Sequence, residues 1–307
     1  MKKRLRLKKK VRNTFLISGL ILIFFSFLFS LGKPLMIRII NKIDKTKTNY
    51  IPSNNIYSKS DNYSFIKTTS KRKVESYSDL KEIYYTFLNS GGSTGNFTCS
   101  SKYKECSEDL KKLINDKDTL SHLNNFVHPY NTFKELDTNF NILGSITVRK
   151  TPNYTKEEID EINKIVKKVD KDIIKDEKSP ANIIKLVHDY IINNTVYSSD
   201  KSSNKKVNNA YGALIEGVGL CDAYTDAFAI FMNYYKIPNF KVEAENHTWN
   251  AVKLNDKWYH IDLTWDDPIT GLNDLVIYKY YMIDTPTLLG LDTKEHKFNK
   301  EVYKELS

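Results

Sequence analysis

The pattern of hydrophobic and polar residues along the 307-residue chain changes character several times. An uninterrupted apolar run extends from Phe15 to Leu31, and a polar stretch rich in Lys, Asn, Ser and Thr follows it without a sustained period. After residue 74, hydrophobic residues recur at helix or strand spacing. We therefore divide the chain into a basic flank (1–13), a transmembrane anchor (14–31), a linker (32–74), an accessory region (75–150) and a main domain (151–307).

The accessory region has the pattern of a small α/β unit. Its apolar spacing predicts a helix over residues 78–89, a second helical stretch around Leu110 and Leu113, and a strand over residues 141–148. Cys99 and Cys106 lie seven residues apart in this region. Outside the cytoplasm, a structural disulfide between them is the favoured interpretation. Metal binding is disfavoured because no His or Cys pair stands nearby at the spacing of zinc ligands.

The main domain combines amphipathic helices with a pair of strands. One helix is expected after Thr155, where a capping-box-like start occurs, and another begins at Pro180. A third is predicted to begin at Cys221, because apolar residues recur after it at helical spacing. Residues 246–254 and 257–265 alternate like two strands joined by a tight turn at Asn255-Asp256.

The net charge of +10 suggests nucleic-acid binding until its position is considered. Residues 1–47 contain 13 of the 47 basic residues and one of the 37 acidic residues. The rest of the chain therefore has 34 basic and 36 acidic residues, a net charge of −2. This distribution argues against a nucleic-acid partner and connects the positive charge with the apolar run.

The apolar run and its basic flank predict a membrane topology. A helix over residues 14–31 would approach the thickness of the hydrocarbon layer, about 30 Å. The basic flank should remain in the cytoplasm, so the bulk of the chain would lie outside. No small-residue cleavage site is evident after the run. We expect a single-pass protein of the cell membrane, with secretion after signal cleavage as the alternative.

Cys221 is the first candidate for chemistry. At the start of a helix, unpaired backbone N–H groups and the helix dipole favour a thiolate, which is a nucleophile. A small, buried, apolar cysteine is the alternative interpretation of this residue alone.

The hairpin supplies the other candidates. If the turn has two residues, Leu254 pairs with Lys257, and His247 and Asp262 become diagonal neighbours on one face. A three-residue loop would instead place them on opposite faces. A thiolate at Cys221 could then attack a carbonyl carbon while His247 handles the proton and Asp262 orients the imidazole. His260 is a weaker alternative for the base, because it lies on the same strand as Asp262.

Several runs of this sequence match a known family. They are Ala210-Tyr211-Gly212-Ala213-Leu214, Gly219-Leu220-Cys221, Asn246-His247-Thr248-Trp249-Asn250, and the segment from Trp258 to Pro268. With them, residues 155–290 resemble the bacterial transglutaminase-like superfamily. The resemblance implies an α+β, papain-like core in which a helix bearing Cys221 packs on an antiparallel sheet bearing His247 and Asp262. The main domain would then be the catalytic domain, with these three residues as its triad.

From this resemblance and the predicted topology we expect an extracytoplasmic enzyme acting on Gln side-chain or peptide amides through a Cys221 thioester. Its substrate would be a protein or peptide, for example in the cell wall, with Trp249, Trp258 and Tyr211 as candidate substrate contacts. No cofactor and no metal site are expected. The alternatives are a papain-like cysteine peptidase and a non-catalytic, wall-associated scaffold that keeps the fold.

Overall fold

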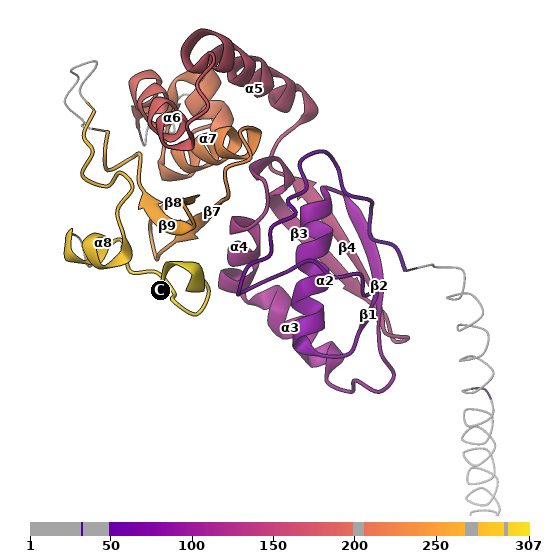
Figure 1. Ribbon diagram of the computed structural model, residues 1–307. Coiled ribbons are helices and arrows are strands. Elements are labelled where there is room, and N and C mark those ends of the chain that lie inside the picture. Colours follow the sequence, from indigo (N-terminus) through magenta and orange to yellow (C-terminus); the bar gives the residue numbers. More distant parts are fainter. Residues whose placement is uncertain (1–31, 33–48, 199–205, 268–275, 292–293) are drawn as a thin grey trace, which may run out of the picture. The chain divides into compact units, whose positions relative to one another are not determined.

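A computed structural model describes residues 32, 49–198, 206–267, 276–291 and 294–307 (Figure 1). The predicted basic flank (1–13), the predicted anchor (14–31) and nearly all of the linker up to residue 48 lie outside these residues. Within the described ranges, no helix combines the length and apolar character required to cross a bilayer.

Residues Asn49–Ser307 form one compact unit, which includes the second half of the predicted linker. Ile51, Tyr63 and Ile66 are buried in its hydrophobic core, and the backbone N–H of Tyr50 donates to the carbonyl oxygen of Asn96. The Lys59 side chain is also buried, and its ammonium donates to the carbonyl oxygen of Asn239. The prediction of a linker is therefore wrong for residues 49–74. Few regular elements form there, but scattered apolar side chains fix the segment to the core.

The accessory region contains three helices and a four-stranded sheet. The helices are α2 (Tyr77–Ser90), α3 (Cys106–Asn115) and α4 (Lys117–Asn125). The strands β1 (Lys73–Val74), β2 (Thr94–Cys99), β3 (Phe133–Phe140) and β4 (Ser145–Pro152) follow the order β1-β2-β4-β3. The predicted helix over residues 78–89 is confirmed as α2, whose Ser76 cap accepts a hydrogen bond from the Asp79 N–H.

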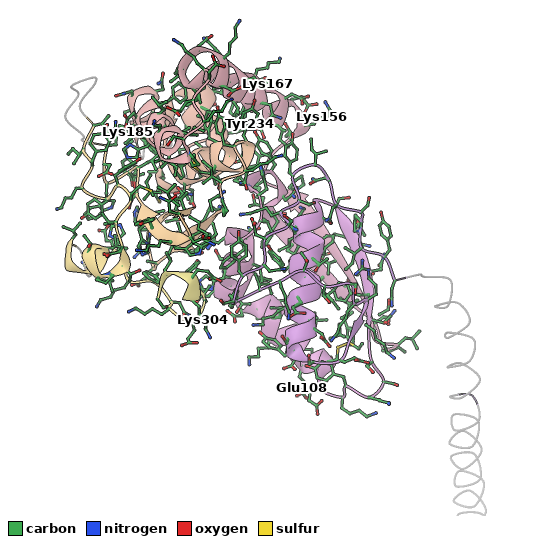
Figure 2. All side chains as sticks on the ribbon, in the orientation of Figure 1. Glu108, Lys156, Lys167, Lys185, Tyr234 and Lys304 are labelled. Carbon is green, nitrogen blue, oxygen red and sulfur yellow. A yellow bond between two sulfur atoms is a disulfide. The ribbon has the colours of Figure 1, made fainter. Side chains whose placement is uncertain are left out.

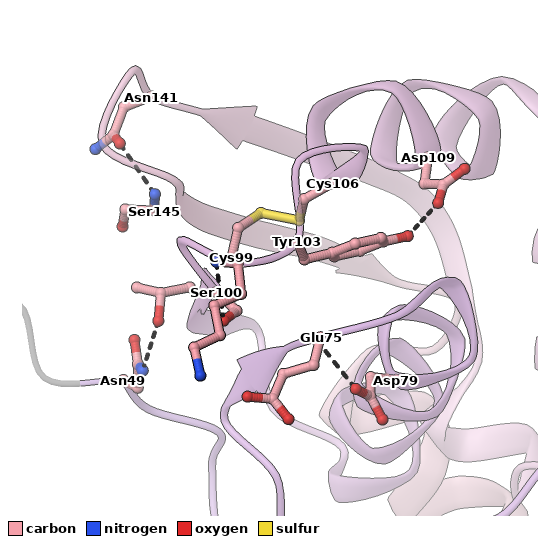
Figure 3. Close-up of a disulfide and its surroundings, with 12 residues drawn as sticks. Asn49, Glu75, Asp79, Cys99, Ser100, Tyr103, Cys106, Asp109, Asn141 and Ser145 are labelled. Carbon is pink, nitrogen blue, oxygen red and sulfur yellow. Dashed lines mark hydrogen bonds between the residues drawn. A yellow bond between two sulfur atoms is a disulfide. The ribbon is translucent and has the colours of Figure 1, made fainter.

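A disulfide joins Cys99, the last residue of β2, to Cys106, the first residue of α3 (Figure 3). The strand predicted over residues 141–148 begins later, at Ser145. Residues 141–144 form a turn instead, because the Asn141 carboxamide oxygen accepts hydrogen bonds from the backbone N–H groups of Leu143 and Ser145. Ile142 is consequently 90% exposed.

The main domain has the three predicted helices: α5 (Lys156–Val169), α6 (Pro180–Asn194) and α7 (Cys221–Tyr234). The capping box at the start of α5 is confirmed, with Thr155 and Glu158 exchanging hydrogen bonds. Lys156 and Lys167 lie on the exposed side of α5 (Figure 2), whereas Ile162 and Val166 are buried in a core shared with α6 and α7.

The predicted hairpin is part of a three-stranded antiparallel sheet, β7-β8-β9 (Asn239–Glu243, Thr248–Leu254 and Lys257–Ile261). Leu254 pairs with Lys257, which confirms the predicted register. Asn255 and Asp256 both have positive φ angles, 49° and 62°, as a two-residue hairpin turn of type I′ requires.

Hydrophobic cores cover both faces of the sheet. Val252 and Ile261 face the core of α5, α6 and α7, whereas Phe240, Val242 and Trp249 belong to the core of the accessory region. Two short parallel strands, β5 (Val196–Tyr197) and β6 (Val218–Gly219), precede α7, and α8 (Thr285–Leu291) follows the sheet. The molecule is a mixed α+β protein, as predicted. Its accessory region and main domain form one compact unit, because the core of the accessory region includes one face of the sheet of the main domain.

Candidate active site

Cys221 is held at the start of α7 by the short strands that precede it. Tyr197 of β5 pairs with Gly219 of β6, and the backbone N–H of Leu220 donates to the carbonyl oxygen of Val207 at 2.7 Å. A Cβ atom at position 219 would lie 2.5 Å from the Cβ of Ala223, so only glycine allows this approach to the first turn of α7. Cys221 itself is partly exposed and is the free cysteine of the chain.

His247 and Asp262 stand at the same end of the sheet. His247 immediately precedes β8, in a turn where its carbonyl oxygen accepts a hydrogen bond from the Ala244 N–H. Asp262 immediately follows β9. Because β8 and β9 are antiparallel, the start of one strand lies beside the end of the other. Both side chains are buried, with exposed fractions of 8% for His247 and 1% for Asp262.

The structure brings Cys221, His247 and Asp262 together. Nε2 of His247 lies 2.5 Å from Oδ2 of Asp262, and Cys221 is near enough to the same imidazole to raise its pKa. Trp249 stacks on the imidazole at a ring distance of 5.7 Å and fixes its plane.

Asp262 receives hydrogen bonds on both of its carboxylate oxygens. Oδ1 accepts from the Thr264 hydroxyl at 2.7 Å and from the backbone N–H groups of Thr264 and Trp265. Oδ2 accepts from His247 and also from Nε2 of His296 at 2.8 Å. His296 lies 34 residues beyond Asp262 and is fully buried. The sequence pattern did not single it out, since it stands in a polar segment with no motif around it.

Electrostatics of the pair favour a charged imidazole. Burial lowers the pKa of His247, but the Asp262 charge and hydrogen bond, together with the Cys221 contact, raise it to about 10. Burial raises the pKa of Asp262. The charge and hydrogen bond of His247, together with the hydrogen bond of His296, outweigh this effect, so the pKa of Asp262 is well below its usual range. At neutral pH the pair is therefore an imidazolium and a carboxylate.

The loop that follows Asp262 is anchored by a second histidine. Nε2 of His188 lies 3.3 Å from a carboxylate oxygen of Asp266, and Nδ1 lies 3.0 Å from Asp189. Asp266 also accepts a hydrogen bond from the Tyr280 N–H, and its own N–H donates to the Asp262 carbonyl oxygen. His188 thus holds the loop that follows Asp262.

A polar cleft of about 370 Å³ opens over Cys221 and His247. Helix α4 of the accessory region forms one wall of this cleft with Ser121 and Asn125. The side chains of both residues donate hydrogen bonds to the Glu243 carboxylate. At the base, Lys241 and Asp226 form a buried ion pair of 2.7 Å. A larger cavity of about 510 Å³, lined by residues 56–61 and parts of α5 and α7, contains none of the three residues of the triad.

The structure does not place the predicted substrate contacts in this cleft. Trp249 is only 1% exposed, and its indole N–H donates to Nδ1 of His260, so it supports the site from below. Trp258 packs on Phe240, with a ring distance of 4.7 Å. The Tyr211 hydroxyl donates to Glu161. None of the three lines the cleft, which polar side chains surround instead, so their contact with substrate stays a prediction.

His260 is not the base. Its two ring nitrogens are engaged by Trp249 and by the Thr285 hydroxyl. Burial lowers the pKa of His260 to about 3, so the ring is neutral.

His247, Asp262 and His296 are close enough to be considered as metal ligands. Ligand atoms bound to one tetrahedral zinc ion at 2.0–2.2 Å lie about 3.4 Å apart. The observed nitrogen–oxygen distances of 2.5 Å and 2.8 Å are too short for that arrangement and are those of charge-assisted hydrogen bonds.

Comparisons with known proteins agree with this geometry. Residues 167–263 match the family model described as the Transglutaminase-like superfamily, a segment that includes Cys221, His247 and Asp262. The resemblance expected from the sequence is thereby confirmed.

Two solved structures are similar to part of the chain. A structure described as a TGase shares 20% identity over 46% of this chain and 46% of its own length, with a TM-score of 0.31. A "Putative Cysteine Protease from Cytophaga hutchinsonii" shares 16% identity over 46% of this chain and 65% of its own, with a TM-score of 0.28. The chain thus spans about half to two thirds of the length of these proteins. No curated protein matches it.

Proposed function

We propose that the protein is a cysteine acyltransferase or amidohydrolase that acts on Gln side-chain or peptide amides through a thioester at Cys221. The observation that carries the proposal is the position of His247, which bonds to Asp262 through Nε2 and lines the same cleft as Cys221. This is the arrangement that activates a sulfur nucleophile.

The proposed reaction begins with an imidazolium at His247 beside a thiolate at Cys221. The sulfur attacks the amide carbon, and the negative charge moves to the carbonyl oxygen, where backbone N–H groups at the start of α7 can stabilise it. His247 then gives its proton to the leaving nitrogen as the C–N bond breaks. For a Gln side chain, the products are ammonia and a thioester.

The thioester passes its acyl group to an acceptor that enters the cleft. An amine acceptor forms a new amide, and water forms a carboxylic acid. In both cases His247 removes a proton from the acceptor, and the Cys221 sulfur leaves. The cleft is polar and partly open, which supports access of a hydrophilic acceptor.

The proposed location is the outer side of the cell membrane, with the first residues in the cytoplasm. The disulfide between Cys99 and Cys106 supports an oxidising compartment. The basic flank and apolar run at the start of the sequence support an anchor, or a secretion signal as the alternative. In this location, cell-wall peptides and surface proteins are the substrates within reach.

Incubating the full chain with a glutamine peptide and a labelled primary amine tests the proposal. We expect ammonia release, with or without incorporation of the amine, and loss of both in Cys221→Ala. Incorporation identifies a transferase, and ammonia alone identifies a deamidase. Cleavage of the peptide backbone would identify a peptidase. Absence of all three products with wall peptides as well as the model peptide would reject the proposed chemistry.

A further inference from the structure

His296 is the least expected residue at the site, because it approaches the triad from a segment near the end of the chain. Its Nε2 lies 2.8 Å from Oδ2 of Asp262, the oxygen that also accepts the hydrogen bond of His247. The two imidazole rings meet nearly at right angles, 86°, with their centres 5.2 Å apart. One carboxylate oxygen therefore receives two imidazole N–H groups.

We propose that His296 is a positioning residue of this site, which holds Oδ2 of Asp262 in place and shares the negative charge of that oxygen with His247. The inference rests on the proposed thiol chemistry of Cys221. His296 does not face the cleft, so it acts through Asp262 and does not contact substrate.

Aromatic rings keep His296 in this position. The imidazole stacks on Tyr280, with an angle of 19° and a ring distance of 5.2 Å. Trp249 and Trp265 contact it edge-on, at 4.8 Å and 5.1 Å. Since the side chain is fully buried, it has no room to rotate away from the carboxylate. The hydrogen bond is therefore a permanent feature of the folded site.

The tautomer of His296 follows from its partner. Asp262 is ionised, so both nitrogens that contact Oδ2 must carry a proton. His296 therefore has its proton on Nε2. A second donor on Oδ2 reduces the charge that this oxygen offers to His247. His247 then holds its own proton less tightly, and a general acid must release its proton during the reaction.

Other titratable groups surround this arrangement and are taken into account in the test. They are Cys221 and Asp222 of α7, Tyr197 of β5, His260 of β9, Asp266 of the following loop, Tyr280, and Glu295 beside His296. Among these, Cys221 and Asp222 act directly on the imidazole of His247.

The first test uses the unmodified full chain with ¹⁵N-labelled histidine. We expect both His247 and His296 to show a proton on Nε2, shifted downfield by the carboxylate and protected from exchange at neutral pH. A spectrum in which His296 carries its proton only on Nδ1 would overturn the proposal. This measurement requires no variant, so it holds even if substitutions at position 296 prevent folding.

The second test follows the imidazole titration of His247 in three variants. His296→Phe keeps a ring in the aromatic stack but removes the donor, and the His247 midpoint should rise by about one pH unit, the lower range expected for a charge-assisted hydrogen bond. His296→Gln places an amide N–H within hydrogen-bond distance of Oδ2 of Asp262 and should restore the wild-type titration midpoint of His247. His260→Gln is the matched control, since this histidine is equally buried on the same sheet but does not contact Asp262.

An unchanged His247 midpoint in the folded His296→Phe variant, or an equal shift in His260→Gln, would reduce His296 to a packing residue. With a substrate in hand, we also expect kcat of His296→Phe to fall about tenfold at unchanged KM, because His247 releases its proton less readily. The titration does not depend on turnover. A shifted midpoint without any amide activity would reject only the proposed function, and activity with an unshifted midpoint would reject only the role of His296.

Discussion

The buried pair of His247 and Asp262 predicts a loss of stability that depends on pH in a specific way. Replacing Asp262 with Asn leaves the shape of the side chain nearly unchanged but removes the charge that faces the imidazole. The exposed fractions of the two residues are 8% and 1%, so solvent cannot replace the lost interaction. We expect Asp262→Asn to be strongly destabilised at pH 6 and much less so near pH 10.

The size of the effect follows from the titration of His247. Its pKa is about 10 in the folded protein, against about 6.5 in an unfolded chain. At about 1.4 kcal/mol per pH unit, the pair contributes about 4–5 kcal/mol at pH 6. Removing one partner of a buried ion pair typically costs about 3–5 kcal/mol, which is the same range. We therefore expect the free energy of unfolding of Asp262→Asn to be about 4 kcal/mol lower than that of the wild type at pH 6.

The sign of the pH dependence is fixed by both groups. The pKa of His247 is raised, so its contribution is complete below the unfolded value near 6.5 and disappears as the pH rises through 10. The pKa of Asp262 is lowered, so its contribution is present above the unfolded value near 3.9 and is lost in acid. The difference in free energy of unfolding between the wild type and Asp262→Asn should be largest between about pH 4 and 6.5. It should fall to about 1 kcal/mol at pH 9.5.

Urea unfolding of the full chain in a non-ionic detergent, followed by tryptophan fluorescence at pH 6 and pH 9.5, measures this difference. Asp226→Asn is the matched control. Asp226 is also a buried aspartate, and its partner Lys241 lies 2.7 Å away. Burial lowers the pKa of Lys241, but the charges of Asp226 and Asp222 outweigh it, and the pKa stays above the ordinary value. In the wild-type protein this lysine is charged at both pH values, so a change of wild-type stability between pH 6 and pH 9.5 does not come from this pair.

A cost of Asp262→Asn that is equal at pH 6 and pH 9.5 would refute the ion pair. It would mean that His247 is neutral in the folded protein and that the bond to Asp262 is an ordinary hydrogen bond.

Three further variants test other parts of the structure by urea or thermal unfolding. Replacing Cys99 and Cys106 with Ala should cost about 2.5 kcal/mol, the loop-closure entropy for cysteines seven residues apart, and an unchanged stability would argue against the disulfide. Gly219→Ala should cost about 1–3 kcal/mol and slow the alkylation of Cys221, because the new Cβ would lie 2.5 Å from Ala223; normal stability and reactivity would contradict the close approach. Ile66→Ala should cost about 2–4 kcal/mol because Ile66 is only 2% exposed, whereas a change within about 0.5 kcal/mol would restore the interpretation of this segment as a linker.

Local sequence patterns predicted the elements that carry the triad. The period-two alternation and the Asn255-Asp256 turn were sufficient to place Leu254 opposite Lys257, and this register brings His247 and Asp262 to one end of the hairpin. The helical spacing after Cys221 predicted α7. These features depend on contacts between residues close in sequence, which is why they can be inferred without a structure.

Features that depend on distant contacts were missed or misassigned. Strand β7 lies between α7 and β8 and is short, so its pattern is weak without its partner strand. Trp249 and Trp258 look like groove residues when only their hairpin is considered, but the core of the accessory region covers them. Residues 49–74 have a polar composition, and only a few apolar side chains such as Ile66 fix them to the fold. Nothing in the sequence around His296 indicates that it reaches Asp262.

The division of roles between parts of the chain has a consequence for specificity. The segment that matches the superfamily model, residues 167–263, contains Cys221, His247 and Asp262. The groups that surround them come largely from elsewhere: His296 holds Asp262 from the C-terminal side, and Ser121 and Asn125 fix Glu243 in the wall of the cleft. The shared chemistry therefore lies inside the matched segment, whereas the shape of the cleft depends on the accessory region. Because that region also covers one face of the sheet, it is a structural part of the site, and substrate preference should change with substitutions in α4.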